Sequence, residues 1–120
     1  MRTDWIDAYC LGKKGAKQDY KQEWQATRAM IGGKMFAMRG GDKNGQPIIT
    51  VKLLPEFGAR LREEYDAIVP GYYMNKTHWN SLYLDADVSE ELLKSMLDQS
   101  YSLVLRSLSK KMQQQIENKA

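Results

Sequence analysis

The 120-residue sequence contains one cysteine, one histidine and three prolines, and what it lacks excludes several classes of protein. A single cysteine, Cys10, cannot form a disulfide within the chain, and we interpret it as a small buried hydrophobic residue. No apolar run approaches the ~18 residues of a membrane-spanning helix. The first residues also lack the apolar segment of a signal peptide. The sequence therefore predicts a cytosolic protein with no membrane segment.

Catalytic and metal chemistry have few residues to draw on. One histidine and one cysteine allow few nucleophile–base pairs or metal-ligand sets, and no Gly-x-Ser-x-Gly, Cys-x-x-Cys or phosphate-loop pattern occurs. The carboxylates near the N-terminus alternate with lysines, whereas an iron site needs several oxygen ligands together. We therefore expect no enzyme activity, no cofactor and no metal. His78 is either a hydrogen-bonded structural residue or a contact to a ligand or phosphate.

Length and charge indicate one ordinary globular domain. The chain is near the commonest size of a single domain, so we expect one domain over residues 1–120, as a monomer. Hydrophobic residues make up 42% of it and charged residues 28%, which excludes a disordered segment. The net charge of +3 permits nucleic-acid binding without requiring it.

Hydrophobic periodicity and turn residues predict seven elements. In chain order these are a short helix capped by Thr3, strands at 24–31, 34–39 and 47–54, a helix from Pro55 that ends before Pro70, a strand at 78–85, and a long helix capped by Asp87 or Ser89. We interpret residues 12–20 as a loop and residues 112–120 as a frayed end or a short extra turn. The order α-β-β-β-α-β-α predicts a two-layer α+β fold, with one antiparallel sheet and helices on one face.

The strand at 78–85 suggests a recognition surface. Alternation places Leu82 and Leu84 toward the helices and two large aromatics on the other face, near Lys52. Exposed aromatics on a sheet favour recognition of unpaired bases or a protein partner. The candidates for such a sheet-face site are Trp24, His78, Trp79 and Tyr83. The alternative, that the chain's own loops cover these aromatics, stays open.

Basic residues on the strands and hairpins give a second candidate surface. The glycine-rich loop at 40–46, with Arg39 and Lys43, resembles a wing that lies along a phosphate backbone. The candidates for nucleic-acid contact are Arg28, Lys34, Arg39, Lys43, Lys52 and Lys76. The alternative is a solvated loop whose lysines maintain solubility.

Two segments carry a resemblance to a known family. The segments are Asn-Lys-Thr-His-Trp-Asn-Ser-Leu-Tyr-Leu-Asp at 75–85 and Glu-Trp-Gln-Ala-Thr at 23–27. With them, the sequence resembles the MmcQ/YjbR family over nearly the whole chain. The resemblance implies a frataxin-like (CyaY-like) fold and DNA binding through a double wing of hairpins, but no agreed set of functional residues. We therefore expect a bacterial DNA-binding protein that binds weakly and electrostatically. The alternative is a protein- or small-ligand-binding module that uses the face of Trp79 and Tyr83.

Overall fold

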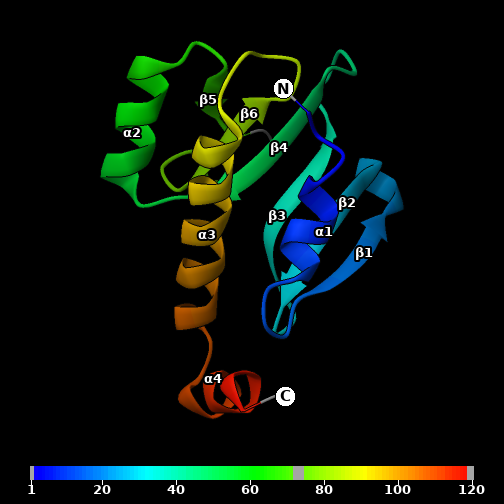
Figure 1. Ribbon diagram of the computed structural model, residues 1–120, viewed down its shortest axis with the longest axis vertical. Helices are drawn as coiled ribbons and strands as arrows, with labels where there is room; N and C mark the ends of the chain where they lie inside the picture. Colours follow the sequence, from blue (N-terminus) through cyan, green and yellow to red (C-terminus); the bar gives the residue numbers. More distant parts are fainter. Residues whose placement is uncertain (1, 72–74, 119–120) are drawn as a thin grey trace.

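A six-stranded antiparallel sheet with helices on one face forms the protein (Figure 1). The computed structural model describes residues 2–71 and 75–118. Its helices are α1 (Ile6–Leu11), α2 (Pro55–Glu64), α3 (Glu90–Ser107) and α4 (Lys110–Glu117), with a 3₁₀ turn η1 at Gln22–Trp24. Its strands are β1 (Lys17–Lys21), β2 (Ala26–Ile31), β3 (Lys34–Gly41), β4 (Pro47–Lys52), β5 (Ile68–Pro70) and β6 (Trp79–Tyr83). The sheet order is β1-β2-β3-β4-β6-β5, which confirms the predicted α+β class.

Several boundaries lie where local chemistry predicts them. Gly32 and Gly33 join β2 to β3 with φ values of 57° and 81°, the left-handed conformations that a two-residue hairpin needs. Pro55 is the first residue of α2, where its missing N–H costs nothing. The Ser89 hydroxyl caps α3 by accepting a hydrogen bond from the Leu92 amide at 3.1 Å. Turn and cap residues therefore predict the connections well.

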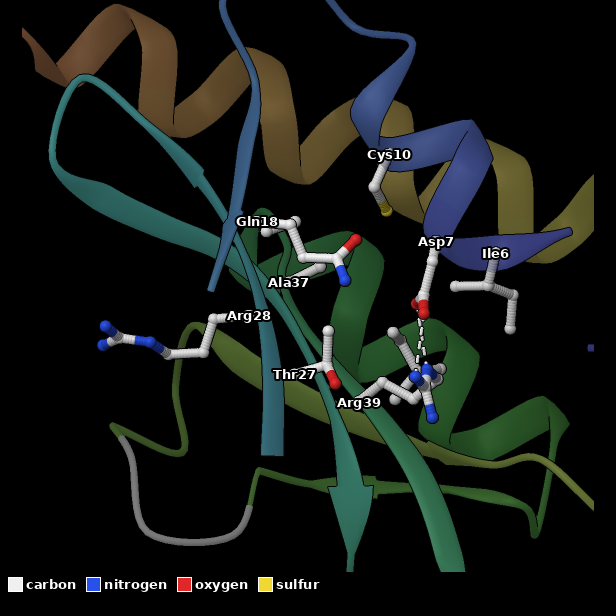
Figure 2. Close-up of a pocket in the computed structure, with 10 residues that line it drawn as sticks. Ile6, Asp7, Cys10, Gln18, Thr27, Arg28, Ala37 and Arg39 are labelled. Carbon is white, nitrogen blue, oxygen red and sulfur yellow. Dashed lines mark hydrogen bonds and ion pairs between the residues drawn. The ribbon is translucent and has the colours of Figure 1, made fainter. Parts of the chain in front are cut away.

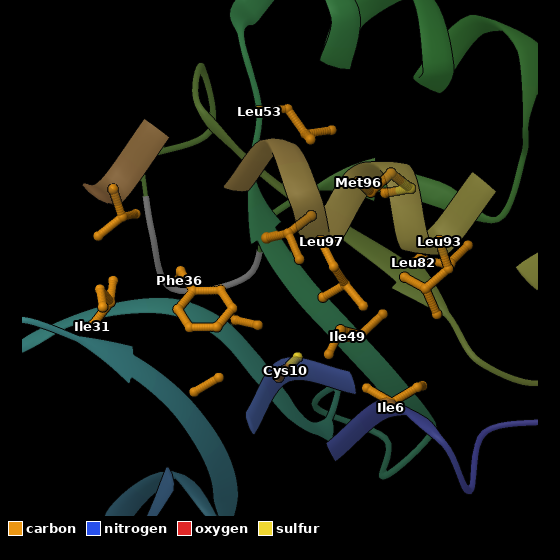
Figure 3. Packing of buried hydrophobic residues seen from close by; sticks show 14 of the residues in the cluster. Ile6, Cys10, Ile31, Phe36, Ile49, Leu53, Leu82, Leu93, Met96 and Leu97 are labelled. Atoms are coloured by element: carbon orange, nitrogen blue, oxygen red, sulfur yellow. The ribbon is translucent and has the colours of Figure 1, made fainter. Parts of the chain in front are cut away.

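The main core lies between the sheet and α3. Leu93, Met96 and Leu97 of α3 have no exposed surface and pack toward Phe36 and Ile49 of the central strands (Figure 3). Cys10 of α1 joins the same cluster with 3% of its surface exposed, which confirms its prediction as a buried residue. The helix face of the sheet is therefore closed over its centre by α3 and α1.

One polar side chain bonds α3 to two strands inside this core. The hydroxyl of Ser100, fully buried, donates to the Phe36 carbonyl of β3 at 2.5 Å and accepts from the Lys52 amide of β4 at 2.8 Å. Both partners are backbone groups, for which burial without a hydrogen bond would cost free energy. Ser100 therefore fixes how α3 sits along the sheet.

The opposite face of the sheet is also buried along its middle. Met38, Thr50 and Ser81 lie side by side on β3, β4 and β6, each less than 5% exposed. The hydroxyls of Thr50 and Ser81 lie 2.7 Å apart and share a hydrogen bond. The alternation that we predicted for these strands is correct, but this face is not simply a solvent-facing surface.

Five features differ from the prediction. Residues 17–21 form edge strand β1 rather than a loop, and residues 68–70 form the short strand β5 before the chain returns as β6. Trp24 belongs to η1 and not to a strand. Helix α1 begins at Ile6, after a turn in which the Thr3 carbonyl accepts from the Ile6 amide. Residues 110–117 form a two-turn helix capped by Ser109, and residues 119 and 120 lie outside the described part.

Leu97→Ala tests the position of α3. Leu97 is fully buried, so its truncation should lower the free energy of unfolding by ~2–5 kcal/mol. Chemical denaturation followed by tryptophan fluorescence measures this change. Leu54→Ala is the matched control, because Leu54 is 51% exposed and its truncation should change stability by less than ~0.5 kcal/mol. Equal stabilities of the two variants would contradict the packing.

Candidate functional site

The six predicted cations do not converge on one surface. Arg39 lies on the helix face, where its guanidinium donates two hydrogen bonds to Asp7 of α1 at 2.9 and 2.8 Å, and this partner raises the pKa of Arg39. Lys34 lies near the end of α3, with Nζ 3.5 Å from the Ser107 hydroxyl. Arg28 lies on the opposite face and extends away from the Asp7–Arg39 pair (Figure 2). The six candidates therefore lie on more than one face of the sheet.

Asp7 and Arg39 line two hollows. The outer one, about 400 Å³, also touches Thr3, Pro47 and Asp85. The inner one is too small for a ligand. This inner cavity measures about 10 Å³, roughly the room that one water molecule needs, and lies between α1 and β1–β4 (Figure 2). The Asp7 carboxylate accepts two hydrogen bonds from the Arg39 guanidinium, and this bidentate contact anchors α1 to β3. The Arg39 guanidinium is therefore held by Asp7 and is not a free cation, although its side chain stays 39% exposed.

The predicted sheet-face cluster also divides. Trp79 and Lys52 are directly opposite on β6 and β4, both partly exposed, as we expected. Trp24 is not beside them, because β2, β3 and β4 separate η1 from β6. The prediction of one surface with Trp24 and Trp79 together is therefore wrong. His78 and Lys76 lie in the segment just before β6, at the end of the strand that carries Trp79.

Three of the predicted residues do come together at the end of two hairpins. Trp24 of η1 faces Lys43, which belongs to the turn between β3 and β4, across a groove of about 540 Å³. Arg28 contacts the Trp24 ring from β2. We call this place the hairpin-end groove, and it is lined by Gln22, Glu23, Trp24, Gln25, Gly41, Asp42, Lys43 and Gly45.

Local backbone geometry places Trp24 at the surface. The chain leaves β1 through the single turn η1 and enters β2 through Gln25, whose φ of 49° is left-handed. This conformation is uncommon for a residue with a side chain and reverses the chain direction sharply. Trp24 is consequently 44% exposed, although it is the kind of residue that folding usually buries.

Two cations lie against the Trp24 ring. The Lys21 amine is 5.6 Å from the ring centroid and the Arg28 guanidinium carbon is 5.8 Å from it, both within the range of cation–π attraction. Each cation also has a carboxylate partner. Lys21 lies 3.2 Å from Glu23, and Arg28 donates two hydrogen bonds to Asp19 at 2.8 and 2.6 Å. These pairs hold the ring in place and offset most of the local positive charge.

The opposite wall of the groove is a turn held by Asp42. One oxygen of Asp42 accepts from the amides of Asn44 at 2.8 Å and Gln46 at 3.0 Å, and the other accepts from the Tyr83 hydroxyl at 2.9 Å. Burial alone would raise the pKa of Asp42, but these hydrogen bonds and nearby Lys43 outweigh it and lower the pKa. Tyr83 therefore supports the turn from β6.

Lys43 is the groove cation with the most freedom to meet a ligand. It is exposed, and among the described residues it has no carboxylate oxygen within 4 Å. The neighbouring carboxylate, Asp42, accepts from the turn amides of Asn44 and Gln46 instead. The groove therefore offers one half-exposed aromatic plane and one available positive charge.

The sequence pattern showed part of this site. Trp24, Arg28, Lys43 and Tyr83 were candidates, although in two different sites. The carboxylates Asp19, Glu23 and Asp42 were not candidates, because pairing across strands cannot be read without the register. The run Asp42-Lys-Asn-Gly carried a usable signal, since aspartate often bonds to turn amides two residues ahead. No group of three metal-ligating side chains is found in residues 2–71 and 75–118.

Comparison with known proteins agrees with the sequence resemblance. The family model YjbR matches residues 11–103. The chain belongs to the YjbR family. YjbR of Escherichia coli strain K12 is 31% identical over 100 residues, which cover 83% of this chain and 84% of that protein. YbdF of Escherichia coli O157:H7 is 38% identical over 86 residues, covering 72% of this chain and 70% of that protein. Both are described as uncharacterized proteins.

Solved structures support the fold of this YjbR-family chain. The crystal structure of Deinococcus radiodurans protein DR2400 is similar with a TM-score of 0.84 and 27% identity, covering 95% of this chain and 86% of that one. A crystal structure from Pseudomonas syringae has a TM-score of 0.72 at 22% identity, covering 86% and 98%. Within the described part of the chain, no helix combines the length and apolar character that crossing a bilayer requires.

The pH dependence of stability tests the Asp42 turn. The pKa of Asp42 is lowered by folding, so its contribution is present above the unfolded value of about 3.9 and is lost as pH falls through the folded value. Asp42→Asn should therefore be less stable than the parent at pH 6, and the difference should shrink below about pH 4. Urea unfolding at pH 6 and pH 3 measures it.

Asp85→Asn is the control for this measurement, because it removes the same charge from an exposed position outside the groove. A stability difference for Asp42→Asn that stays constant between pH 6 and pH 3 would show that the ionised carboxylate does not hold the turn.

Proposed function

We propose that this protein is a weak, non-enzymatic nucleic-acid-binding domain that takes a single strand at the hairpin-end groove. The observation that carries the proposal is the half-exposed Trp24 ring facing an available cation, Lys43, across a groove of about 540 Å³. An aromatic plane next to a positive charge is the combination by which single-strand binders stack a base and hold its phosphate. The DNA-binding expectation from the family resemblance points to the same class of ligand.

A single strand suits the groove better than a duplex. Bases in a duplex are already stacked on one another, so an exposed tryptophan gains little from them, whereas an unpaired base can lie on the ring. A major-groove reader needs an exposed helix with several basic and amide side chains aimed at base edges. In α3, the longest helix, the residues along the middle of one side are buried in the core instead. The proposal therefore includes little sequence preference.

Binding should be weak because the groove is nearly neutral. Asp19 and Glu23 partner Arg28 and Lys21, the two cations beside the Trp24 ring. Arg39 on β3 is occupied by Asp7. Each phosphate contact changes the slope of log affinity against log salt by about 0.7 for a single strand. With Lys43 as the main available cation, we expect a shallow salt dependence, close to that of one contact.

The alternative function, a protein- or small-ligand-binding module at Trp79 and Tyr83, has less support. The Tyr83 hydroxyl is bound to Asp42, and Trp79 is only partly exposed. Trp79 also packs closely against the backbone, because a Cβ added at Gly71 would lie 2.8 Å from the Trp79 Cβ. Lys52 opposite Trp79 is the observation that keeps this surface as the second candidate.

Trp24→Ala tests the proposed groove. Loss of one base stack is worth ~1–3 kcal/mol, so affinity for a fluorescent 15-nucleotide thymidine strand should fall by about 5- to 150-fold. Affinity for a duplex of the same length should change less. Fluorescence anisotropy at low salt measures both. Tyr20→Ala is the matched control, because Tyr20 is 60% exposed on β1 but does not line the groove.

Lys43→Gln adds an independent measurement on the same groove. It should reduce the slope of log affinity against log salt for the single strand by about 0.7, and it should leave the melting temperature unchanged. Three results would refute the proposal: no binding of single strands at low salt, parent-like binding by Trp24→Ala, or a larger loss from Trp79→Ala than from Trp24→Ala. The third result would favour the surface around Trp79 instead.

A further inference from the structure

The two edges of the sheet differ in how open they are. Strand β5 is three residues long and ends at Pro70, which has no amide hydrogen to donate. Strand β1 forms the other edge with five residues, four of them exposed and the fifth partly buried. Along an antiparallel edge strand, the N–H and C=O of one residue point toward the paired strand, and those of the next residue point away from it. The outer side of β1 thus presents a row of main-chain donors and acceptors.

Among the residues that the structure describes, none outside β2 hydrogen-bonds to the backbone in the middle of β1. The backbone groups of residues 17–21 pair with β2, and within residues 2–71 and 75–118 no further backbone or side-chain partner is found for the amides and carbonyls of Gln18, Asp19 and Tyr20. Exposed strand edges of this kind accept an additional strand.

A groove of about 470 Å³ adjoins this edge. Its floor and walls combine Lys17 and Gln18 of β1 with Met30 of β2 and with Met112 and Ile116 of α4. Methionine side chains adapt to partners of different shape and are frequent on surfaces that bind several ligands. We call this place the methionine groove.

Helix α4 is fixed in the position that forms the groove. Ile116 is buried, and it lies with Ile31 against Gly15: a Cβ added at Gly15 would lie 3.0 Å from Ile116 and 3.1 Å from Ile31. The Lys14 amine donates to the Glu117 carbonyl at 2.7 Å. Met112 lies one turn before Ile116 on the same side of α4, yet it is 37% exposed. An apolar side chain on the packed side of a fixed helix is thus left partly uncovered.

Charge decides what kind of strand suits this edge. Lys17, Lys110 and Lys111 are exposed and have no carboxylate within 4 Å among the described residues, whereas Asp19 is occupied by Arg28. A second copy of this chain is disfavoured, because antiparallel pairing of two β1 strands centred on Asp19 opposes Asp19 to Asp19 and Lys17 to Lys21. Like charges directly opposite each other destabilise a strand pair.

We propose that β1 and the methionine groove form a docking site for an extended acidic peptide segment of a partner protein. The segment adds as a seventh strand along the outer edge of β1, places one large apolar side chain against Met112 and Met30, and sets a carboxylate near Lys17. Main-chain hydrogen bonds supply affinity, and the groove supplies selectivity for the apolar residue. This site is separate from the hairpin-end groove, which lies beyond the other end of β1.

A synthetic peptide tests the docking site. The probe is a labelled nine-residue peptide in which threonine and glutamate alternate around one central leucine, with versions carrying methionine or phenylalanine at the centre. Fluorescence anisotropy should show binding, and amide NMR shifts should map to residues 17–21 and to α4. N-methylation of alternate residues along one edge of the peptide should abolish binding, whereas methylation along the other edge should not. That asymmetry is specific to strand addition.

Two pairs of protein variants complete the test. Met112→Ala should weaken binding about five- to tenfold, as expected for loss of most of an apolar contact, while Leu54→Ala, an exposed leucine remote from the groove lining, should not. Lys17→Glu should weaken binding, while Lys76→Glu should not. Circular dichroism checks that each variant is folded.

Four outcomes would overturn the proposal. They are no binding by any of the three peptides at millimolar concentration, equal binding by both N-methylated forms, preference for a version with lysine in place of glutamate, and concentration-dependent dimerisation of the protein through residues 17–21. The last outcome would assign the edge to a second copy of the chain.

Discussion

The docking of α3 across the central strands is the constraint on which the rest of the structure depends. Apolar burial supplies most of its stability, but burial alone is not directional. The hydroxyl of Ser100 adds direction, because it bonds to the Phe36 carbonyl and the Lys52 amide at once. Gln99 extends the same contact by accepting from the Leu54 amide at 2.8 Å. Sliding α3 along the sheet would break all three bonds inside or beside the core.

This constraint explains why the candidate surfaces lie at the periphery. With α3, α1 and α2 over one face and the middle of the other face buried, the sheet centre leaves no room for a ligand. Ligand-sized grooves occur instead at places where a strand begins or ends. The hairpin-end groove lies between η1 and the β3–β4 turn, and the methionine groove lies between β1 and α4. Function in this fold is therefore expected at strand ends and edges.

The fold could be predicted from the sequence wherever a local rule is strong. Gly32-Gly33 determines a tight hairpin, Pro55 and Ser89 mark helix starts, and the apolar stripe through Leu97 and Val104 identifies the buried side of α3. Edge strand β1 gives no such signal. Its sequence, Lys-Gln-Asp-Tyr-Lys, has no apolar alternation, because neither of its faces is buried. The strand exists through pairing with β2, and pairing partners cannot be read from one segment.

The candidate site could be predicted less well, for the same physical reason. A cation in the sequence gives no indication of the carboxylate that folding places beside it. Arg28 meets Asp19 nine residues away, while Arg39 meets Asp7 thirty-two residues away, and both contacts follow from register and helix docking. The sequence predicts Trp24 at the start of a strand near Trp79, whereas the 3₁₀ turn η1 carries it, after an edge strand that has no apolar pattern.

Strand β1 connects the two proposed surfaces and keeps them distinguishable. Its last residue, Lys21, contacts the Trp24 ring, and its first residue, Lys17, lines the methionine groove. Because five extended residues span roughly 16 Å, the two grooves are separated by the length of the strand. Asp19, in the middle, bonds to Arg28 across to β2 and anchors the strand between them. Strand β1, which has the weakest sequence signal, therefore contributes to both surfaces. Because its side chains are exposed, it has no apolar pattern, and the same exposure leaves it accessible to a partner.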